Sequence, residues 1–373
     1  MYPIDAPAPY PREQWYVAGT AQEFGREIVA RQILGDPLVF YRTEAGEPVA
    51  LWGLCPHRLM PFELGSLRDD EVVCGYHGFT FSAQGKCVSI PTSEQISPAC
   101  RVRSYPLVER GPWVWIWMGE GAPDHDRLPD ASDIGLGADP GEWRVDVTRT
   151  FDLQARAQLL IDNLMDLSHL AFVHVNSVGP AEIALLQPEI TRDGDRLGVT
   201  RTTTDVPRDG FVTFLMPDAP DRIWSALVTD FYSPALINAG GPWVWGSTPD
   251  GARGEAVGKL NFIHAMTPAG PNRTHYFGVL TRNFRQDDDA LSGMLSAQND
   301  MVRDEDVTAL EAIEKVVDRY GDIRREISVK PDAGALSVRR LIRKLILAET
   351  GGAGEDGASY ERAPEPAAAQ PSW

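Results

Sequence analysis

The chain is poor in cysteine and in basic residues. Its four cysteines among 373 residues cannot form a disulfide scaffold, so in a reducing compartment those that matter are expected to be metal ligands or nucleophiles. With 35 basic and 53 acidic residues the formal charge is −18. Such an acidic chain repels phosphate backbones, which argues against nucleic-acid binding.

Long apolar runs are also absent. No run is long enough to cross a membrane, so no membrane association is expected. The first residues, MYPIDAPAPYPREQ, do not combine a basic start with an apolar stretch, as a secretory signal does. We therefore expect a cytoplasmic protein.

The first third of the chain is β-rich. Residues 1–14 are rich in proline and are interpreted as an N-terminal extension. Over 15–120, short β-like runs such as WYVAG and GPWVWIWMG alternate with glycine and proline, which predicts an all-β domain of small antiparallel strands. Residues 121–142 are acidic and rich in glycine and proline, and they are interpreted as a linker.

The remainder mixes helices with strands, so the whole chain is predicted to be α+β. A second domain is expected over 143–348, with helix-like patterns at 154–172, 288–320 and 335–348 and several strand-like runs between them. The tail, 349–373, is rich in glycine, alanine, proline and glutamate, which is typical of a disordered segment.

Two cysteines and two histidines form the first cluster of candidate ligands. Cys55-Pro-His57 is followed, after sixteen residues, by Cys74-Gly-Tyr-His77. Two cysteines and two histidines can bind one tetrahedral zinc, but C-x-H is tighter than the usual zinc spacing. A [2Fe–2S] cluster with two cysteines on one iron and two histidines on the other fits better, and this is the Rieske arrangement. The other cysteines, Cys87 and Cys100, are interpreted as ordinary core or surface residues.

A second cluster lies in the segment DNLMDLSHLAFVH. On a helix, Asp162, Asp166 and His169 fall within about 60° of one another and share a face. For His174 to reach the same metal, the helix has to end or distort near 172–173. Two imidazoles and one carboxylate make the facial triad of non-haem Fe(II) oxygenases. The alternative is a pair of core histidines held by neighbouring acids.

The third ligand of such a triad is expected from the helix at 288–320. There Asp306 lies in the apolar stripe, whereas Asp300, Asp304 and Glu305 point toward solvent on a helical wheel. A buried carboxylate needs a partner, and a metal ion is a suitable one. The alternative is a buried aspartate paired with an arginine or a backbone cap.

The two motifs, C-x-H-x16-C-x2-H and D-x3-D-x2-H-x4-H, resemble those of the oxygenase subunits of Rieske non-haem iron oxygenases, from Trp15 to roughly Ala348. Shorter stretches, DNLMDLSHLAFVH, HAMTP and EDVTALEAIE, are similar to the vanillate O-demethylase and dicamba monooxygenase group. The resemblance implies an N-terminal Rieske [2Fe–2S] domain and a C-terminal helix-grip catalytic domain with an antiparallel sheet. It also implies an aromatic-compound monooxygenase that is a head-to-tail homotrimer.

The resemblance assigns roles by motif position. Cys55 and Cys74 would bind one cluster iron, and His57 and His77 the other.

In the catalytic domain, His169, His174 and Asp306 would bind the mononuclear Fe(II). Asp166 would bridge to a Rieske histidine of the adjacent subunit and carry electron transfer. Substrate contacts are expected from Asn163, Asn238 and His264, and the apolar candidates for the pocket wall are Leu160, Leu164, Phe211, Phe214, Leu236, Phe262 and Phe277.

The implied function is the oxygenase component of a multicomponent monooxygenase. A separate ferredoxin or reductase would deliver NAD(P)H electrons, since the chain has no dinucleotide-binding fingerprint, and O₂ would be the co-substrate. A small, methoxybenzoate-like aromatic would be O-demethylated or hydroxylated. The alternatives are ring cis-dihydroxylation, N-demethylation or hydroxylation of a natural product, and, more remotely, a Rieske electron carrier without oxygenase activity.

Overall fold

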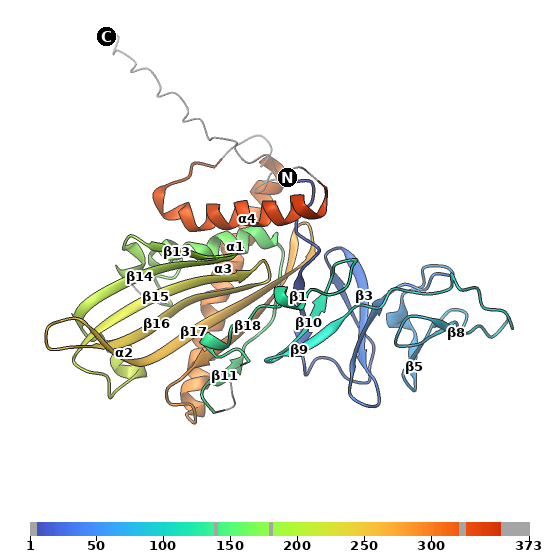
Figure 1. The fold of residues 1–373 in the computed structure, drawn as a ribbon, viewed down its shortest axis with the longest axis horizontal. Helices are drawn as coiled ribbons and strands as arrows, with labels where there is room; N and C mark the ends of the chain where they lie inside the picture. The colour runs from blue at the N-terminus through green and yellow to red at the C-terminus, as the bar shows by residue number, and fades with distance from the viewer. Residues whose placement is uncertain (1–5, 138–140, 179–181, 321–325, 352–373) are drawn as a thin grey trace, which may run out of the picture.

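The fold is an elongated α+β arrangement, seen in a computed structural model that describes residues 6–137, 141–178, 182–320 and 326–351 (Figure 1). Small sheets formed by the first third of the chain lie at one end. A large curved sheet with helices lies at the other. This confirms the predicted fold class. Among the described residues, no helix is both long and apolar enough to cross a membrane.

The N-terminal part contains three small antiparallel sheets. Their strands are β1 (Trp15–Thr20), β10 (Trp113–Trp117) and β9 (Leu107–Arg110) in the first, β2 (Val29–Ile33), β3 (Asp36–Arg42) and β4 (Pro48–Trp52) in the second, and β5 (Ser66–Arg68), β6 (Glu71–Val73), β7 (Thr80–Phe81) and β8 (Cys87–Ser89) in the third. The third sheet forms the outer end of the molecule, away from the large sheet, in Figure 1.

The C-terminal part is built on an eight-stranded antiparallel sheet in the order β11-β18-β17-β16-β15-β14-β13, with β12 also paired to β18. Its strands are β11 (Arg144–Val147), β12 (Phe151–Leu153), β13 (Glu189–Asp193), β14 (Arg196–Pro207), β15 (Arg222–Ser233), β16 (Leu236–Ser247), β17 (Arg253–Gly270) and β18 (Arg273–Arg282). The helices are α1 (Ala157–Met165), α2 (Gly210–Leu215), α3 (Asp289–Tyr320) and α4 (Ala333–Glu349). Among the 3₁₀ turns are η1 (Phe62–Leu64), η2 (His125–Arg127), η3 (Ser132–Ile134), η4 (Leu167–Ala171), η5 (Glu182–Leu185) and η6 (Lys330–Asp332).

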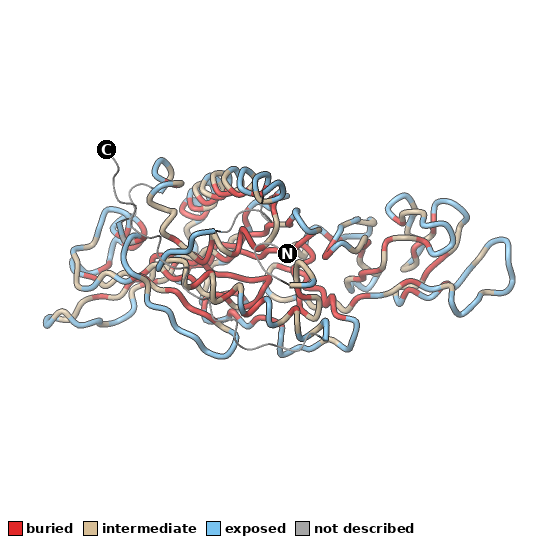
Figure 2. The backbone as a smooth tube through the Cα atoms, turned by 90° about the horizontal axis from the view of Figure 1, so that it is seen from above, coloured by how far each residue is buried: buried red, intermediate tan, exposed pale blue. Residues whose placement is uncertain are grey.

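One apolar cluster joins the two parts. It contains the tryptophans of β1 and β10 together with residues of β16, β17 and β18 such as Leu236 and Phe277. Backbone bonds reinforce it, because Leu34 N–H donates to the Pro268 carbonyl at 2.7 Å and Gly35 N–H to the Ala269 carbonyl at 2.8 Å. Figure 2 shows buried chain both in the large sheet and in the small ones.

The segment interpreted as a linker contributes to this cluster. Leu128, Ala131, Ile134 and Leu136, which lie in or beside η2 and η3, are all buried in it. Residues 138–140 lie outside the described part of the chain. The segment between the two parts is therefore packed against both of them.

The long helices cover the sheet, and α4 also contacts α1 and the N-terminal residues. Arg339 of α4 binds the Asp162 carboxylate of α1 at 2.6 Å. The Glu349 carboxylate at the end of α4 accepts from the backbone N–H groups of Arg12 and Glu13 at 2.6 and 2.9 Å. The predictions of helices at 288–320 and 335–348 are confirmed within one or two residues. The tail prediction falls mostly on 352–373, outside the described residues.

A largely buried acid on β15, Asp230, predicts a pH-dependent stability. Burial raises the pKa of Asp230 to about 6, because the opposing charge of Arg196, 3.9 Å away and also bound to Asp133, does not offset it. Ionising Asp230 therefore costs more in the folded chain than in the unfolded one. We expect Asp230→Asn to stabilise the fold by about 2–3 kcal/mol above pH 7, a gain that shrinks as pH falls from 6 to 4. Thermal unfolding of both proteins between pH 4 and 8 checks this, and a gain that stays constant with pH would contradict it.

Candidate metal centres and substrate cavity

The first site consists of two matching turns, one between β4 and η1 and the other between β6 and β7. In the first turn, Leu59 N–H donates to the Cys55 carbonyl at 2.8 Å, and in the second, Gly78 N–H donates to the Cys74 carbonyl at 3.0 Å. The fifth residue of each turn has a positive φ, 56° at Leu59 and 72° at Gly78, so the chain reverses in the same way twice. Each turn thus presents one cysteine and, two or three residues later, one histidine.

The donor set of these turns is divided between inside and outside. Cys55 and Cys74 are buried, at 1% and 3% exposure, and His57 and His77 are exposed, with ring centroids 4.6 Å apart. Burial, together with the adjacent Cys74 thiol, raises the pKa of Cys55 to about 11, so the two thiols lie close together. This arrangement fits a cluster with a buried cysteine-bound iron and an exposed histidine-bound iron.

A single zinc ion fits the four residues less well. Four ligand atoms around one zinc would converge within about 4 Å of one another. Among the described residues, the group of three or more metal-binding side chains whose ligand atoms lie within 4.8 Å of one another is a different one, His169, His174 and Asp306. The wider spacing of the cysteine and histidine donors favours a two-iron cluster over zinc.

The second site begins where α1 ends. Asp166 leaves the helix with φ −126° and ψ 94°, and its side chain accepts from Ser168 N–H to cap η4. The predicted distortion near 172–173 therefore lies earlier in the chain, and the prediction that Asp162, Asp166 and His169 share one helical face is wrong. A capping aspartate breaks the helix, so His169 lies on a 3₁₀ turn.

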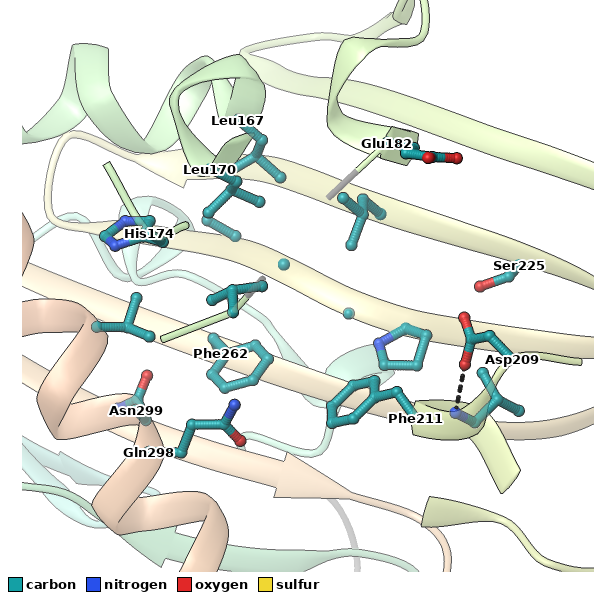
Figure 3. A pocket seen from close by; sticks show the side chains of 18 of the residues that line it. Leu167, Leu170, His174, Glu182, Asp209, Phe211, Ser225, Phe262, Gln298 and Asn299 are labelled. Carbon is teal, nitrogen blue, oxygen red and sulfur yellow. Dashed lines mark hydrogen bonds between the residues drawn. The ribbon is translucent and has the colours of Figure 1, made fainter. Parts of the chain in front are cut away.

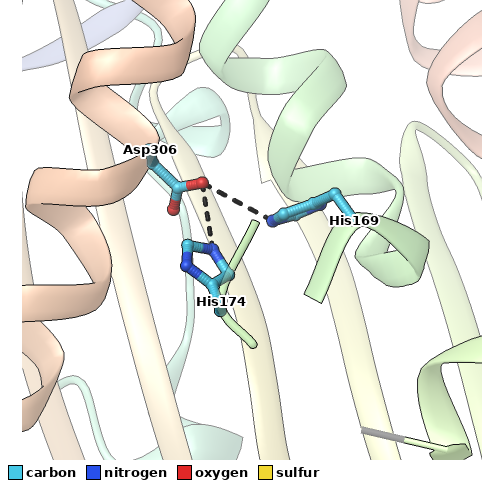
Figure 4. Close-up of side chains that lie close together, drawn as sticks. All are labelled: His169, His174 and Asp306. Carbon is cyan, nitrogen blue, oxygen red and sulfur yellow. Dashed lines mark hydrogen bonds and ion pairs between the residues drawn. The ribbon is translucent and has the colours of Figure 1, made fainter. Parts of the chain in front are cut away.

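Two histidines that follow this break, His169 and His174, meet Asp306 of α3 (Figure 4). The Asp306 carboxylate lies 3.1 Å from His174 Nε2 and 3.6 Å from His169 Nε2. Ligands about 2.1 Å from one ion and at right angles to each other are about 3 Å apart, so the spacing fits a facial set. The triad is nearly closed to solvent, because His174 and Asp306 are 0% and 4% exposed. The donor set, two imidazoles and one carboxylate, is typical of non-haem Fe(II) oxygenases.

The pKa shifts of His169 and Asp306 suit metal binding, whereas the pKa of His174 is raised, because its contacts with Asp306 and Glu305 outweigh burial. Burial lowers the pKa of His169, which keeps this imidazole neutral and able to act as a ligand. Burial would raise the pKa of Asp306, but the hydrogen bond with His174 and the two nearby imidazoles keep it below its usual range. Asn163 adds to this effect, since its amide donates to Asp306 Oδ1 at 3.0 Å.

Glu305 is a member of the site that the helical wheel placed in solvent. Its Oε2 lies 2.7 Å from His174 Nδ1 and accepts from Ser177 Oγ at 2.6 Å. The chain after η4 crosses over α3 and brings His174 between Glu305 and Asp306. A carboxylate on the far nitrogen of a ligating histidine fixes the tautomer and the orientation of the ring. The acidic pair Glu305–Asp306 was the available signal, but the wheel cannot show which segment crosses the helix.

Asp166 is held by donors of its own chain. Arg201, which is 1% exposed, donates from Nη2 to Asp166 Oδ1 at 3.1 Å, and Ser168 Oγ donates to Oδ2 at 2.9 Å. Its contact with His169 is through the backbone, because His169 Nδ1 lies 2.6 Å from the Asp166 carbonyl. The carboxylate stays 19% exposed. Exposed Phe172 and Val175 lie a few residues further along the chain.

A cavity of about 670 Å³ extends from the triad between α3 and the sheet. Figure 3 shows His174 at one end, Phe262 in the middle, and Phe211 and Asp209 toward the other end. Of the predicted apolar wall, Leu164, Phe211 and Phe262 line it. Leu160, Leu236 and Phe277 belong instead to the apolar clusters behind it, and Phe214 is exposed.

Beyond the triad, the buried polar side chains that line this cavity include His264, Arg303 and Asn299. His264 lines it, and burial followed by the charge of Arg303 lowers the pKa of His264 to about 3. Its Nδ1 lies 2.6 Å from the Tyr276 hydroxyl, whose own pKa burial raises to about 12. Arg303 is 1% exposed, stacks 4.0 Å from the Tyr276 ring, and its Nε has no hydrogen-bond partner among the described residues.

The other predicted substrate contacts lie elsewhere. Asn163 faces Asp306 and is not among the described residues that line the cavity. Asn238 is fully buried and donates to Asn261 Oδ1 at 3.4 Å, while its neighbour Ala239 lines the cavity. A role for these two residues in substrate binding stays a prediction.

Comparison with known proteins assigns both sites to one family. Residues 14–106 match the Rieske [2Fe–2S] domain, and residues 153–348 match the vanillate O-demethylase oxygenase C-terminal domain. The chain is 35% identical to a putative toluene-4-sulfonate monooxygenase system iron–sulfur subunit of Comamonas testosteroni, over 91% of this chain and 98% of that one. It is 33% identical to the dicamba O-demethylase oxygenase component of Stenotrophomonas maltophilia, over 90% and 97%.

Solved structures agree with these relatives. Dicamba monooxygenase bound to 3,6-dichlorosalicylic acid superposes with a TM-score of 0.81 at 28% identity, covering 91% of this chain and 98% of that one. Another structure of the same enzyme contains non-haem iron. The chain therefore belongs to the Rieske non-haem iron oxygenases of the vanillate O-demethylase type, whose oxygenase components carry a [2Fe–2S] cluster and a mononuclear iron.

Proposed function

We propose that this oxygenase component O-demethylates or hydroxylates a small aromatic acid, such as a methoxybenzoate. The observation that carries the proposal is the position of the His169, His174 and Asp306 triad at one end of a largely apolar cavity. A cavity of about 670 Å³ is well within the size range of small-molecule sites. A triad that leaves coordination positions open toward such a cavity brings O₂ and a substrate C–H bond together.

Each residue of the site then has a role. His169, His174 and Asp306 would hold iron(II), and Cys55, His57, Cys74 and His77 would hold the [2Fe–2S] cluster. When bound, the cluster would relay electrons from the redox partner and the iron would activate O₂, chemistry that side chains cannot provide.

The protein around the metals orients the ligands and excludes water. Glu305 holds the proton on His174 Nδ1, so that Nε2 stays free to bind the metal, and Asn163 fixes the Asp306 carboxylate. The buried leucines and Phe262 keep the reacting carbon dry.

An acidic substrate is supported by charge. Neutral His264 lines the cavity and hydrogen-bonds both the Tyr276 hydroxyl, through Nδ1, and the Ala239 backbone, so a substrate oxyanion would compete for its N–H. Arg303 adds a buried positive charge with an unpaired donor. The names of similar proteins agree with this, since one refers to toluene-4-sulfonate and another structure contains 3,6-dichlorosalicylic acid.

Replacing His264 should weaken substrate binding. We expect His264→Phe to raise KM about 10-fold for an aromatic acid, because one hydrogen bond to a charged group is lost, with little change for a neutral aromatic of the same shape. Tyr276→Phe is the matched control, because it keeps the His264 imidazole and removes only the hydroxyl that lies 2.6 Å from its Nδ1. Steady-state kinetics on both substrates decide the point, and an equal effect on acid and neutral compounds would refute the assignment.

The electron path is proposed to cross between subunits. The cluster turns and the triad lie in different parts of one chain, on opposite sides of the β1-β10-β9 sheet (Figure 1). Exposed Leu59 and Tyr76 beside the cluster, and Phe172 and Val175 beside Asp166, are apolar surfaces suited to an interface. We propose a head-to-tail homotrimer in which Asp166 bridges to a Rieske histidine of the adjacent subunit.

We also propose the redox partner and the cellular compartment of the enzyme. A separate ferredoxin or reductase would supply electrons, and the free cysteines suit a reducing cytoplasm. We also propose that the domains run over 15–120 and 143–348.

A coupled turnover assay tests the function. Iron-loaded protein, a surrogate reductase, NADH and O₂ are mixed with methoxylated and unsubstituted benzoates, phenols and sulfonates. Formaldehyde in equal amount to the demethylated product is the expected result. A cis-diol product would replace the proposal with ring dihydroxylation. No O₂ uptake with any aromatic, despite a reducible cluster, would overturn the substrate class.

A further inference from the structure

Cys87 and Cys100, which neither metal centre uses, face each other across paired backbone. The bridge between Lys86 and Arg101 places Cys87 opposite Cys100, and Cys87 N–H donates to the Cys100 carbonyl at 3.1 Å. Residues opposite each other at such a position have Cα atoms about 5.5 Å apart, within the span of a disulfide. Side chains at directly opposite positions lie on the same face of the paired backbone, and the Cys100 thiol is close enough to contribute to the raised pKa of Cys87.

The two thiols differ in accessibility. Both are free, but Cys87 is 2% exposed, whereas Cys100 is partly exposed at the end of a surface loop. Burial, and then the neighbouring Cys100 thiol, raise the pKa of Cys87 to about 12. Cys87 is therefore a poor first nucleophile, and an oxidant from solvent reaches Cys100 first.

We propose that Cys87 and Cys100 form a modification site that peroxide oxidises to a disulfide. The Cys100 sulfur attacks one peroxide oxygen, the O–O bond breaks, and the second oxygen leaves as water with the thiol proton. The Cys87 sulfur then attacks the resulting sulfenic acid, the S–S bond forms, and the S–O bond breaks to release a second water. In total two thiols are oxidised and one hydrogen peroxide is reduced to two waters.

The modification would act on the cluster turns through the intervening loop. Residues 88–99 are mostly exposed, and the loop returns against the second turn, where a Cβ added at Gly78 would lie 2.9 Å from Pro91 Cγ. Gly78 follows His77 directly. The disulfide would join the two ends of this loop and fix Pro91 against the turn, so we expect the oxidised protein to lose its cluster to a chelator more slowly.

Peptide mapping without reduction tests the proposal on the full-length, cluster-loaded protein. After treatment with hydrogen peroxide and alkylation of the remaining thiols, the expected product is a peptide pair linked through Cys87 and Cys100 that dithiothreitol separates. In Cys87→Ser, Cys100 should stop at the sulfenic acid, which a dimedone reagent labels. Chelator-induced bleaching of the cluster, with and without peroxide, measures the effect of the link.

Several outcomes would overturn it. Cys100 found as the sulfonic acid, or both thiols alkylated after peroxide, would show that the pair does not couple. A link from either cysteine to Cys55 or Cys74 in loaded protein would show a different pairing. The peptide map of the wild-type protein decides the question even if Cys87→Ser does not fold. Cys100→Ala, a change at the more exposed position, is the second variant, and it cannot form the link. Equal bleaching rates would remove the effect on the cluster.

Discussion

Asp306→Ala is expected to lose the mononuclear iron and to keep the Rieske cluster. Removing the carboxylate leaves two imidazoles, and since losing an outer hydrogen-bond partner alone costs about 10–100-fold in metal affinity, losing a ligand should cost more. Turnover should fall by at least about 100-fold. Iron analysis per protomer, together with the visible and EPR spectra of the cluster, measures the two centres separately.

Asp304→Ala is the matched control for this variant. Asp304 lies two residues earlier on α3, is 57% exposed and pairs with Arg149 at the surface, so its loss should change neither iron content nor turnover. Full iron occupancy and turnover in Asp306→Ala would show that the carboxylate is not a ligand. Loss of the cluster signal in the same variant would point to a folding defect instead.

Asp166→Asn is expected to leave both metal centres loaded and to slow turnover by about 100-fold or more. The amide keeps the shape but removes the negative charge that would hold a protonated histidine of the adjacent subunit. It also leaves buried Arg201 without its counter-ion, so some loss of stability is expected as well. The measurement is a single turnover, in which the pre-reduced protein meets O₂ and substrate and the reoxidation of the cluster is followed.

The control separates electron transfer from folding. Ser168→Ala removes a hydroxyl from the same carboxylate and keeps its charge, so reoxidation should stay near the wild-type rate. Normal unfolding temperature with slow reoxidation in Asp166→Asn would support the bridge. Reoxidation at the wild-type rate would refute it.

Much of this site is readable from the sequence because its ligands come in short, local patterns. Cys55 to His57 and Cys74 to His77 each lie on one turn, so their spacing alone carries the geometry. The apolar stripe of α3 places Asp306 inward for the same reason. What fails are statements that need a tertiary neighbour. Glu305 turns toward the site because it hydrogen-bonds His174. Asp166 ends its helix because its carboxylate caps η4 and binds Arg201.

The meeting of the polar side chains around the cavity lies beyond the sequence for the same reason. His264 and Tyr276 come from β17 and β18, and the register between these strands decides that they touch. Cys87 and Cys100 looked like unrelated small residues because a loop of twelve positions separates them. The residues whose backbones pair there carry no sequence pattern that predicts this pairing.

The hydrogen bonds between the Glu349 carboxylate and the backbone of Arg12 and Glu13 can form only late in synthesis. These N–H groups leave the ribosome among the first of the chain and wait for a carboxylate that emerges 337 positions later. The outer strands can pair meanwhile, but β1 also rests on β17, since Thr267 Oγ1 donates to the Val17 carbonyl at 2.8 Å. The N-terminal part therefore completes its packing only after translation has passed α4, so nascent chains stalled before that helix should be open to proteases at their start.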